Sequence, residues 1–266
     1  LEGGAVGLRD AELSLFAGSV QRRIIRISSG ENVRELGGFP TPGGPTHWHR
    51  FLRSGTTGSL TSRDLHYLCR YGVGYVADLR SVDELAHVPD PFAKQPAVTY
   101  INVPLYSCDL HDPKIEQGLS EATEQGAYGN FLVEGYLSML ANSAAMQRLF
   151  SFFATVPHDT CVLFHCTAGM DRTGVISMLL LALAGVDLEH IVADYAYSYT
   201  GVDDVDSWLF GDKVVPNTET NRVSLQTMRV VYQQLLRAYG SVEGYLGSCG
   251  ICAEDVARVR CHLLES

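Results

Sequence analysis

Two apolar runs separated by a short glycine-containing loop constrain the fold of this chain more than any other feature. Residues 161–164 are all apolar and predict a buried strand, and residues 173–184 predict an apolar helix that ends at Gly185. The loop between them, HCTAGMDRTG at residues 165–174, joins strand to helix directly. Because strand, loop and helix in this order form the repeating unit of α/β proteins, the chain is predicted to belong to that class.

The rest of the sequence shows the same alternation of strand and helix. Thr61, followed three positions later by Asp64, forms a capping box that predicts the start of a helix, and Gly72 predicts its end. We therefore expect a central, mostly parallel sheet flanked by helices. Further strands are predicted at residues 23–27, 49–53, 75–79 and 98–103, and further helices at residues 128–153, 188–199, 223–239 and 253–264.

The domain organisation follows from what the chain lacks. No linker rich in Gly, Ser or Pro divides the 266 residues, so residues 1–266 are predicted to form a single domain. Residues 1–22 precede the first predicted strand and are expected to be an N-terminal extension. Residues 200–222 are polar and irregular, and we expect them to form a lid.

Composition and charge narrow the range of partners. Hydrophobic residues make up 46% of the chain and charged residues 19%, which is ordinary for a protein with a sizeable core. The formal net charge is −10 and no run of Lys and Arg offsets it, so we expect no nucleic-acid partner. A single site can still be locally positive in an acidic protein, which leaves a phosphorylated protein or a small phosphomonoester as the expected substrate.

Cysteine usage and hydropathy bear on the compartment. Seven irregularly spaced cysteines do not suggest a disulfide framework, and reduced thiols predict a cytoplasmic protein. The most apolar run, residues 179–183, is far shorter than the ~18 residues of a membrane span, and no signal peptide is recognised. Because the chain begins with Leu1 rather than Met, removal of a leader and export stay open, as does the oligomeric state.

A cysteine followed six positions later by an arginine occurs twice, and the two pairs differ in their surroundings. Cys252 and Arg258 enclose two carboxylates and no glycine on a predicted helix, which would repel an anion, so we interpret this pair as structural. Cys166 and Arg172 lie instead in the loop between strand and helix, where backbone amides at the positive end of a helix dipole bind an oxyanion. Chemistry is therefore expected at Cys166.

The loop after Cys166 has the features of a phosphate cradle. Small side chains let the backbone amides approach a phosphate closely, and Gly169 can adopt a positive φ. The same amides would stabilise a Cys166 thiolate, and the planar guanidinium of Arg172 matches two phosphate oxygens. The residues predicted to bind phosphate are Thr167, Ala168, Gly169, Met170, Asp171, Arg172 and Thr173.

The expected reaction forms a cysteinyl phosphate that water hydrolyses, without a metal or other cofactor. A general acid must protonate the leaving oxygen, and two aspartates are candidates: Asp171 within the loop, and Asp109 just after the strand predicted at residues 98–103. Thr173 either donates its hydroxyl to the Cys166 sulfur or caps the following helix, and the sequence alone does not separate these roles.

The loop HCTAGMDRTG resembles the active-site loop HC-x-A-G-K-D-R-T-G of the bacterial tyrosine and dual-specificity phosphatases, the family of mycobacterial protein tyrosine phosphatase B and its Listeria relatives. Three more segments are similar to motifs of that family: NVRELGG at residues 32–38, FLRS at 51–54 and DLRSVDE at 78–84. Residues 246–264 resemble its terminal helix pair. The resemblance covers residues 23–265 and implies the three-layer cysteine-phosphatase fold and the hydrolysis of protein phosphotyrosine.

This resemblance also implies roles for individual residues. Cys166 would be the nucleophile, Arg172 the phosphate ligand and Asp171 a proposed acid, while Asp109 corresponds to a second proposed catalytic aspartate. Five residues of the outer motifs are interpreted as supports of the loop and the sheet, since buried Arg and Asp usually pair: Asn32, Arg34, Arg53, Asp78 and Arg80.

One position departs from the family pattern. The loop lysine, which the family associates with phosphoinositide recognition, is Met170 here, and this change removes a cation from the mouth of the site. We therefore predict phosphotyrosine-type monoesters as substrates in preference to phosphoinositides, and leave activity on phosphoserine and phosphothreonine open.

Other interpretations of the loop remain. A rhodanese-like sulfurtransferase would not obviously need both Asp171 and Arg172, and an arsenate reductase would need a resolving cysteine nearby, whereas Cys161 lies on a predicted strand. A non-catalytic phosphate-binding pseudophosphatase is the third alternative. The presence of Cys, Arg and Asp in one loop argues against it.

Overall fold

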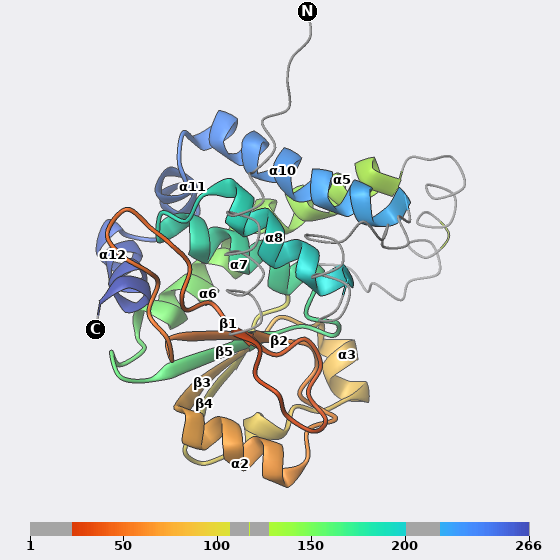
Figure 1. The fold of residues 1–266 in the computed structure, drawn as a ribbon, viewed down its shortest axis with the longest axis vertical. Coiled ribbons are helices and arrows are strands. Elements are labelled where there is room, and N and C mark those ends of the chain that lie inside the picture. The colour runs from red at the N-terminus through yellow and green to blue at the C-terminus, as the bar shows by residue number, and fades with distance from the viewer. Residues whose placement is uncertain (1–22, 107–116, 118–127, 201–218, 266) are drawn as a thin grey trace, which may run out of the picture.

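The computed structural model describes residues 23–106, 117, 128–200 and 219–265, and it has an α/β architecture (Figure 1). Five strands form one sheet in the order β1-β2-β5-β3-β4. All neighbouring pairs are parallel except β1 with β2, which confirms the predicted mostly parallel sheet. The strands are β1 (Arg34–Glu35), β2 (Phe51–Ser54), β3 (Val73–Asp78), β4 (Thr99–Asn102) and β5 (Cys161–His165).

Helices cover both faces of this sheet. Helix α2 (Ser62–Tyr71) and the short 3-10 helix η1 (Pro91–Lys94) pack against one face, through Leu68 and Phe92. Helix α3 (Val82–His87) follows β3. The other face carries the larger helical layer (Figure 1). Its helices are α5 (Tyr128–Ala141), α6 (Ser143–Ala154), α7 (Asp171–Leu183), α8 (Leu188–Thr200), α10 (Glu219–Tyr239), α11 (Val242–Ser248) and α12 (Ala253–Leu264).

Alternate residues of β5 enter two separate hydrophobic cores. Val162 and Phe164 pack into the core under the larger helical layer, together with Phe153. Leu163 points to the other face and packs with the core that includes Leu68 of α2. Because successive side chains of a strand face opposite sides, a strand buried on both faces needs an unbroken apolar run. This requirement explains the continuous apolar sequence that precedes the loop.

Capping residues fix the ends of several helices as the sequence predicts. The Thr61 side chain accepts a hydrogen bond from the Asp64 amide, and the Asp64 carboxylate accepts one from the Thr61 amide, so the capping box forms. Gly72 ends α2 with a φ of 117°, and Gly185 follows α7 with a φ of 84°. Side chains with a Cβ rarely adopt these angles, which makes glycine the preferred residue there.

Two predicted elements differ from the structure. Residues 128–153, predicted as one helix, form α5 and α6, because Asn142 interrupts the helix and its side chain caps α6. Residues 23–27, predicted as a strand, make only an isolated bridge between Ile24 and Arg34. The neighbouring strand β1 has only two residues and offers no longer edge for pairing.

Some predictions fall outside the described residues. These are the N-terminal extension at residues 1–22 and residues 201–218 of the expected lid. The single-domain organisation stays a prediction. Among the described helices, none combines the length and the apolar character that crossing a membrane requires.

A buried ion cluster ties β1 and β2 to α8. The Asp194 carboxylate accepts a hydrogen bond from Arg34 Nε at 2.8 Å and pairs with Arg53 Nη1, and all three residues are at most 2% exposed. Burial acts to raise the pKa of Asp194, but the charges of Arg34 and Arg53 outweigh burial and hold the pKa at about 2. The cluster therefore stays charged at neutral pH and supports the sheet, as expected for Arg34 and Arg53.

We expect Asp194→Asn to lower the free energy of unfolding by about 3–5 kcal/mol, because it leaves two buried guanidinium groups without their carboxylate. Urea unfolding at pH 7 measures this change. Glu189→Gln on the same helix is the matched control. Its ion pair with Arg229 is solvent-accessible, with the Glu189 side chain 47% exposed and the Arg229 side chain 31% exposed, so its loss should lower the free energy of unfolding by less than about 1 kcal/mol. Equal losses in the two variants would contradict the assignment.

Candidate active site

The predicted loop lies between β5 and α7, where β2, β3 and β5 present their carboxyl ends. Cys166 follows β5 directly and is 2% exposed. Thr173 Oγ1 donates a hydrogen bond to Cys166 Sγ at 3.1 Å. The N-cap position of helix α7 is occupied by Met170, not Thr173, and no side chain makes a capping hydrogen bond there. Of the two roles predicted for Thr173, the contact with sulfur is therefore the one that the geometry adopts.

Gly169 lets the loop pack tightly against the end of β2. Its φ is 70°, and a Cβ at this position would lie 2.6 Å from the Ser54 oxygen. The Gly169 carbonyl accepts hydrogen bonds from Arg53 Nη2 at 2.7 Å and from Asn32 Nδ2 at 2.9 Å. Arg53 and Asn32 thus hold the loop by its backbone, in agreement with the supporting role predicted for them. Any residue with a side chain at Gly169 would both strain the backbone and collide with β2.

Glu84 of α3 holds Arg172 in place. Arg172 Nη1 donates to Glu84 Oε2 at 2.5 Å and Nη2 donates to Oε1 at 2.8 Å, and Thr167 Oγ1 donates to the same carboxylate. Arg172 is 5% exposed and Glu84 is 9% exposed. Burial acts to raise the pKa of Glu84, but the hydrogen bonds from Arg172 and Thr167 outweigh it and lower the pKa to about 2. A charged, bidentate pair therefore fixes the plane of the guanidinium.

The position of Glu84 follows from the start of α3. Ser81 caps this helix by accepting a hydrogen bond from the Glu84 amide, while the Ser81 amide donates to Glu84 Oε2 at 2.8 Å. This capping box is readable in the sequence as Ser-x-x-Glu. In the sequence, Glu84 is recognisable only as part of a motif, and its contact with Arg172, which lies 88 positions away, cannot be predicted from neighbouring residues.

Tyr136, which is itself hydrogen-bonded to Tyr195, holds the carboxyl group of Asp171 at the first turn of α7. The Tyr136 hydroxyl, from α5, donates a hydrogen bond to Asp171 Oδ1 and is also hydrogen-bonded to the Tyr195 hydroxyl of α8. Both tyrosines are 1% exposed. No motif in the sequence pointed to this pair. The second predicted acid, Asp109, lies outside the described residues.

A cavity of about 430 Å³ lies beside the loop. It adjoins Glu84 and Thr167, so it lies beside the loop that follows Cys166. Its volume is within the range of small-molecule pockets. The lining residues are Thr56, Arg80, Asp83, Glu84, His87, Val88 and Thr167.

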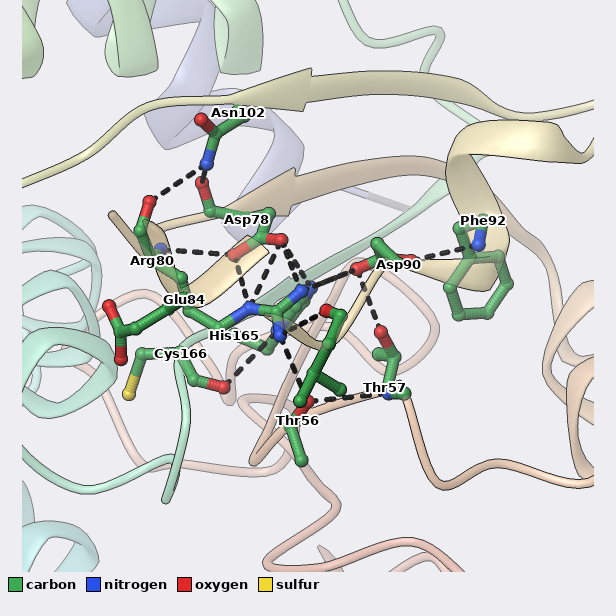
Figure 2. Close-up of polar contacts among 12 residues, drawn as sticks. Thr56, Thr57, Asp78, Arg80, Glu84, Asp90, Phe92, Asn102, His165 and Cys166 are labelled. Carbon is green, nitrogen blue, oxygen red and sulfur yellow. Dashed lines mark hydrogen bonds and ion pairs between the residues drawn. The ribbon is translucent and has the colours of Figure 1, made fainter. Parts of the chain in front are cut away.

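One group of metal-type donor atoms occurs among the described residues, formed by Asp78, Asp90 and His165. Figure 2 shows these side chains close together, beside Arg80 and near Cys166. Arg80 Nη2 lies 2.7 Å from Asp78 Oδ2 and 3.8 Å from Asp90 Oδ2, so a guanidinium already supplies positive charge between the two carboxylates. This arrangement fits an ion-pair network better than a metal centre.

The fold and the loop together define a class of protein, the α/β proteins in which a glycine-containing loop after a buried cysteine joins a central strand to a helix. Within that class, the family model described as the tyrosine phosphatase family matches residues 25–265. The chain therefore belongs to the tyrosine phosphatase family and is a phosphatase. This result confirms the resemblance found in the sequence motifs.

Relatives are similar over most of the chain. A tyrosine-protein phosphatase of Nostoc commune is 31% identical over 224 residues, which cover 80% of this chain and 74% of that protein. The triple specificity protein phosphatase PtpB of Mycobacterium tuberculosis is 27% identical over 81% of this chain and 91% of its own length. Among solved structures, P. aeruginosa TpbA aligns over 84% of this chain and 96% of its own, with 13% identity and a TM-score of 0.40, too low to support a comparison of folds.

We expect Glu84→Gln to lower kcat/KM for an aryl phosphate by about 10²-fold, because an amide cannot accept both hydrogen bonds from Arg172 and the guanidinium loses its orientation. Steady-state kinetics at pH 6–7 measure the loss. Glu254→Gln is the control, since it removes an exposed pair with Arg258 at 2.6 Å and should leave activity unchanged. Activity of Glu84→Gln within about threefold of the wild type would show that Arg172 needs no such partner.

Proposed function

We propose that this protein hydrolyses phosphomonoesters, with phosphotyrosine side chains as its preferred substrate, through a cysteinyl phosphate at Cys166. The observation that carries the proposal is the geometry around that sulfur. Cys166 is buried at the start of the loop, Thr173 donates to its Sγ, and Arg172 is clamped six positions later. The similarity to proteins named tyrosine-protein phosphatase supports the substrate class.

In the first step the Cys166 thiolate attacks phosphorus, the S–P bond forms and the P–O bond to the leaving group breaks. Asp171 gives its proton to the leaving oxygen, with Tyr136 orienting its carboxyl group. Arg172 and the loop amides stabilise the charge on the equatorial oxygens. Preorganised donors of this kind typically contribute about 2.7–4 kcal/mol each to lowering the barrier.

In the second step a water molecule attacks the phosphorus of the cysteinyl phosphate. The Asp171 carboxylate takes a proton from that water, phosphate forms and the S–P bond breaks. The hydroxyl of Thr173, 3.1 Å from Cys166 Sγ, stabilises the departing thiolate by donating a hydrogen bond to it. The enzyme returns to its starting state without an external cofactor.

Two observations support a phosphorylated protein as the substrate. Met170 places an apolar thioether in the loop, where the family pattern has a lysine, and a thioether packs well against an aromatic ring. The cavity of about 430 Å³ beside Thr167 provides room for a neighbouring residue of the substrate. We further infer a reducing, cytoplasmic location, supported by the six cysteines of the described residues, all of which are free.

Hydrolysis of a chromogenic aryl phosphate in the presence of EDTA tests the proposal. We expect the wild type to hydrolyse the aryl phosphate under these conditions. The rate of Cys166→Ser should be lower by at least about 10³-fold, because an uncharged serine is a far weaker nucleophile. Cys252→Ser, which changes the cysteine of the second Cys-to-Arg pair, should keep wild-type activity. Dependence on metal, or equal activity of Cys166→Ser, would refute the proposal.

The same assay assigns the general acid when Asp171→Asn and Asp109→Asn are run beside it. Loss of the acid abolishes the basic limb of the pH profile and slows esters with poor leaving groups most. We expect this signature for Asp171→Asn. If only Asp109→Asn loses the basic limb, Asp109 is the general acid and Asp171 has a structural role in the loop.

The preference against phosphoinositides depends on residue 170. We expect Met170→Lys to raise kcat/KM for a multiply phosphorylated phosphoinositide by about 10-fold, because it restores a cation at the mouth of the site. Activity on a phosphotyrosine peptide should change less. If the wild type already hydrolyses both substrates equally and Met170→Lys alters neither, the inferred role of Met170 is wrong.

A further inference from the structure

An exposed basic and aromatic surface lies along helix α2, on residues that the proposed reaction does not use. Four exposed side chains share one side of this helix, because they lie three, four and seven positions from the first: Arg63, His66, Tyr67 and Arg70. The other side of α2 packs through Leu68 into the core on the sheet face opposite the larger helical layer (Figure 1). The helix therefore presents its charged side to solvent.

This side of α2 lines two adjoining hollows. The larger has a volume of about 480 Å³ and is lined by His49, Arg63, His66, Tyr67, Arg70 and Tyr71. The smaller has a volume of about 330 Å³ and is lined by Arg26, Ile27, Ser28, Arg63, Asp64 and Tyr67. Because Arg63 and Tyr67 line both hollows, the two lie next to each other, and we call them together the α2 groove.

The arginines of the α2 groove carry positive charge that no ion pair balances. Arg26, Arg63 and Arg70 are exposed, and none of them makes an ion pair with another described residue. The surface arginines Arg229 and Arg258, by contrast, are each paired with a glutamate. In a chain whose net charge is −10, three unpaired guanidinium groups are a local excess of positive charge. Such an excess attracts an anionic partner.

The acid that lines the groove is already engaged. The Asp64 carboxylate accepts hydrogen bonds from the hydroxyls of Ser29 and Thr61 and from the Ser28 amide at 3.0 Å. These hydrogen bonds, of which that from Ser29 has the largest effect, lower the pKa of Asp64, so it stays ionised at neutral pH. It makes no ion pair with Arg63, its neighbour in the chain. One carboxylate thus accompanies three guanidinium groups, and the α2 groove is positive.

Stacked rings give the larger hollow a fixed wall. The His49 and Tyr71 rings are stacked with centroids 4.1 Å apart, and the Tyr67 ring centroid lies 6.2 Å from that of Tyr71. His49 has a φ of 62°, a left-handed conformation that residues other than glycine seldom adopt. Glu35 Oε1 holds the pair by accepting from the His49 amide at 2.8 Å and from the Tyr71 hydroxyl at 2.7 Å. Rings fixed in this way lose little freedom when a ligand binds.

We propose that the α2 groove binds an extended acidic segment of a protein, and that this protein is a substrate of the phosphatase. Carboxylates of the segment pair with the unbalanced arginines, and side chains between them pack on Tyr67. Arg63 and Arg70 are seven positions apart, or about 10 Å along the helix axis, which about three residues of an extended segment span. The assignment of a substrate rests on the proposed function of Cys166.

A short stretch of chain connects the α2 groove to the loop that follows Cys166. Arg26 and Ser28 line the smaller hollow, and Asn32 donates to the Gly169 carbonyl at 2.9 Å. The six peptide units from Arg26 to Asn32 span at most about 22 Å. A linker of about eight residues reaches about 26 Å or more when extended, so one substrate can place a phosphotyrosine at the loop and an acidic segment in the groove.

The α2 groove suits a peptide better than a membrane or a nucleic acid. A helix that binds a bilayer inserts its apolar side into the lipid, whereas the apolar side of α2 is buried, with Leu68 only 1% exposed. A nucleic acid carries a phosphate on every nucleotide, and three arginines on a protein of net charge −10 neutralise few of them. An acidic peptide matches both the small number of cations and the rings between them.

Fluorescence anisotropy with an unphosphorylated peptide tests binding without any catalysis. The probe is a fluorescein-labelled peptide of about ten residues rich in Glu and Tyr, and its control has Gln in place of Glu. We expect the wild type to bind the Glu peptide at least about 10-fold more tightly, and the double variant Arg63→Glu/Arg70→Glu to lose this difference. High salt should weaken binding as well.

Arg237→Glu is the matched control variant, since it makes the same charge change at an exposed arginine of α10. It should bind the Glu peptide like the wild type. Equal affinity of the wild type for the Glu and Gln peptides would overturn the proposal. So would wild-type affinity in the folded double variant. If the double variant does not fold, the comparison of the two peptides and the salt dependence of the wild type still decide.

Competition distinguishes the other kinds of partner. Vesicles that contain phosphatidylserine and a single-stranded oligo-dT are each added to the complex of wild-type protein and Glu peptide. We expect neither to displace the peptide at equal concentration of charge. Displacement by vesicles or by the oligonucleotide at lower concentration than unlabelled Glu peptide would mean that the α2 groove serves a membrane or a nucleic acid, which contradicts the proposal.

Kinetics with phosphotyrosine peptides test the link to catalysis. Each peptide carries a phosphotyrosine and, about eight residues away on either side, a Glu-rich or a Gln-rich segment. We expect KM to be about 10-fold lower for the Glu-rich peptide at similar kcat, because the second contact raises the effective concentration at the loop. The ratio of the two KM values should fall toward one in Arg63→Glu/Arg70→Glu and stay high in Arg237→Glu.

The outcomes separate this inference from the proposed function. Binding of the Glu peptide without any difference in KM would overturn the assignment of a substrate. If the protein binds the Glu peptide but hydrolyses no phosphotyrosine peptide, the proposed function is refuted, and the assignment of a substrate with it, whereas the acidic-segment site stands. Hydrolysis of both peptides without binding of the Glu peptide would leave the proposed function in place and refute this inference alone.

Discussion

Buried positive charge is the constraint on which the rest of this structure depends. A phosphate cradle needs cations, and burying an arginine is costly unless a carboxylate accompanies it. Arg34, Arg53, Arg80 and Arg172 are each at most 5% exposed, and each is paired with a buried acid. The pairs of Arg34, Arg53 and Arg172 join segments that are far apart in sequence. The loop therefore has a defined shape because its surroundings must satisfy their charges.

The same constraint reconciles an acidic protein with an anionic ligand. The net charge is −10, yet Glu84 and Asp194, two acids near the loop, are already engaged with arginines. Glu84, whose pKa is lowered to about 2 against the effect of burial, orients Arg172, and its charge is balanced by that arginine. What remains for a ligand is a set of backbone amides at the start of α7 and a guanidinium held in one plane.

Local signals in the sequence predicted much of the fold and marked the loop around Cys166 as the candidate site. The apolar run of β5, the capping box of α2 and the glycine after α7 are properties of neighbouring residues, so they can be read directly. Helix α12 occupies the predicted residues 253–264. Strand β1 could not be predicted in this way because two residues carry no periodicity.

The side-chain contacts that support the candidate site could not be predicted from local signals. Glu84 reaches Arg172, Tyr136 reaches Asp171 and Asp90 reaches His165 only after the sheet has formed. Such pairs depend on strand order and on which helix covers which face, neither of which hydrophobic periodicity specifies. The motif around residues 78–84 marked Glu84 as part of a pattern, but its partner was not apparent from that pattern. Long-range charge pairing is thus the part of the site that required the structure.

Covalent chemistry at Cys166 is the central proposal for this protein, and trapping the cysteinyl phosphate tests it most directly. Wild-type protein mixed with an aryl phosphate, quenched in denaturant within milliseconds and mapped by mass spectrometry should carry one phosphoryl group, on the peptide that contains Cys166. The same peptide from Cys166→Ser should carry none. A phosphoryl group on another residue, or rapid turnover with no labelled peptide at any time, would contradict the account.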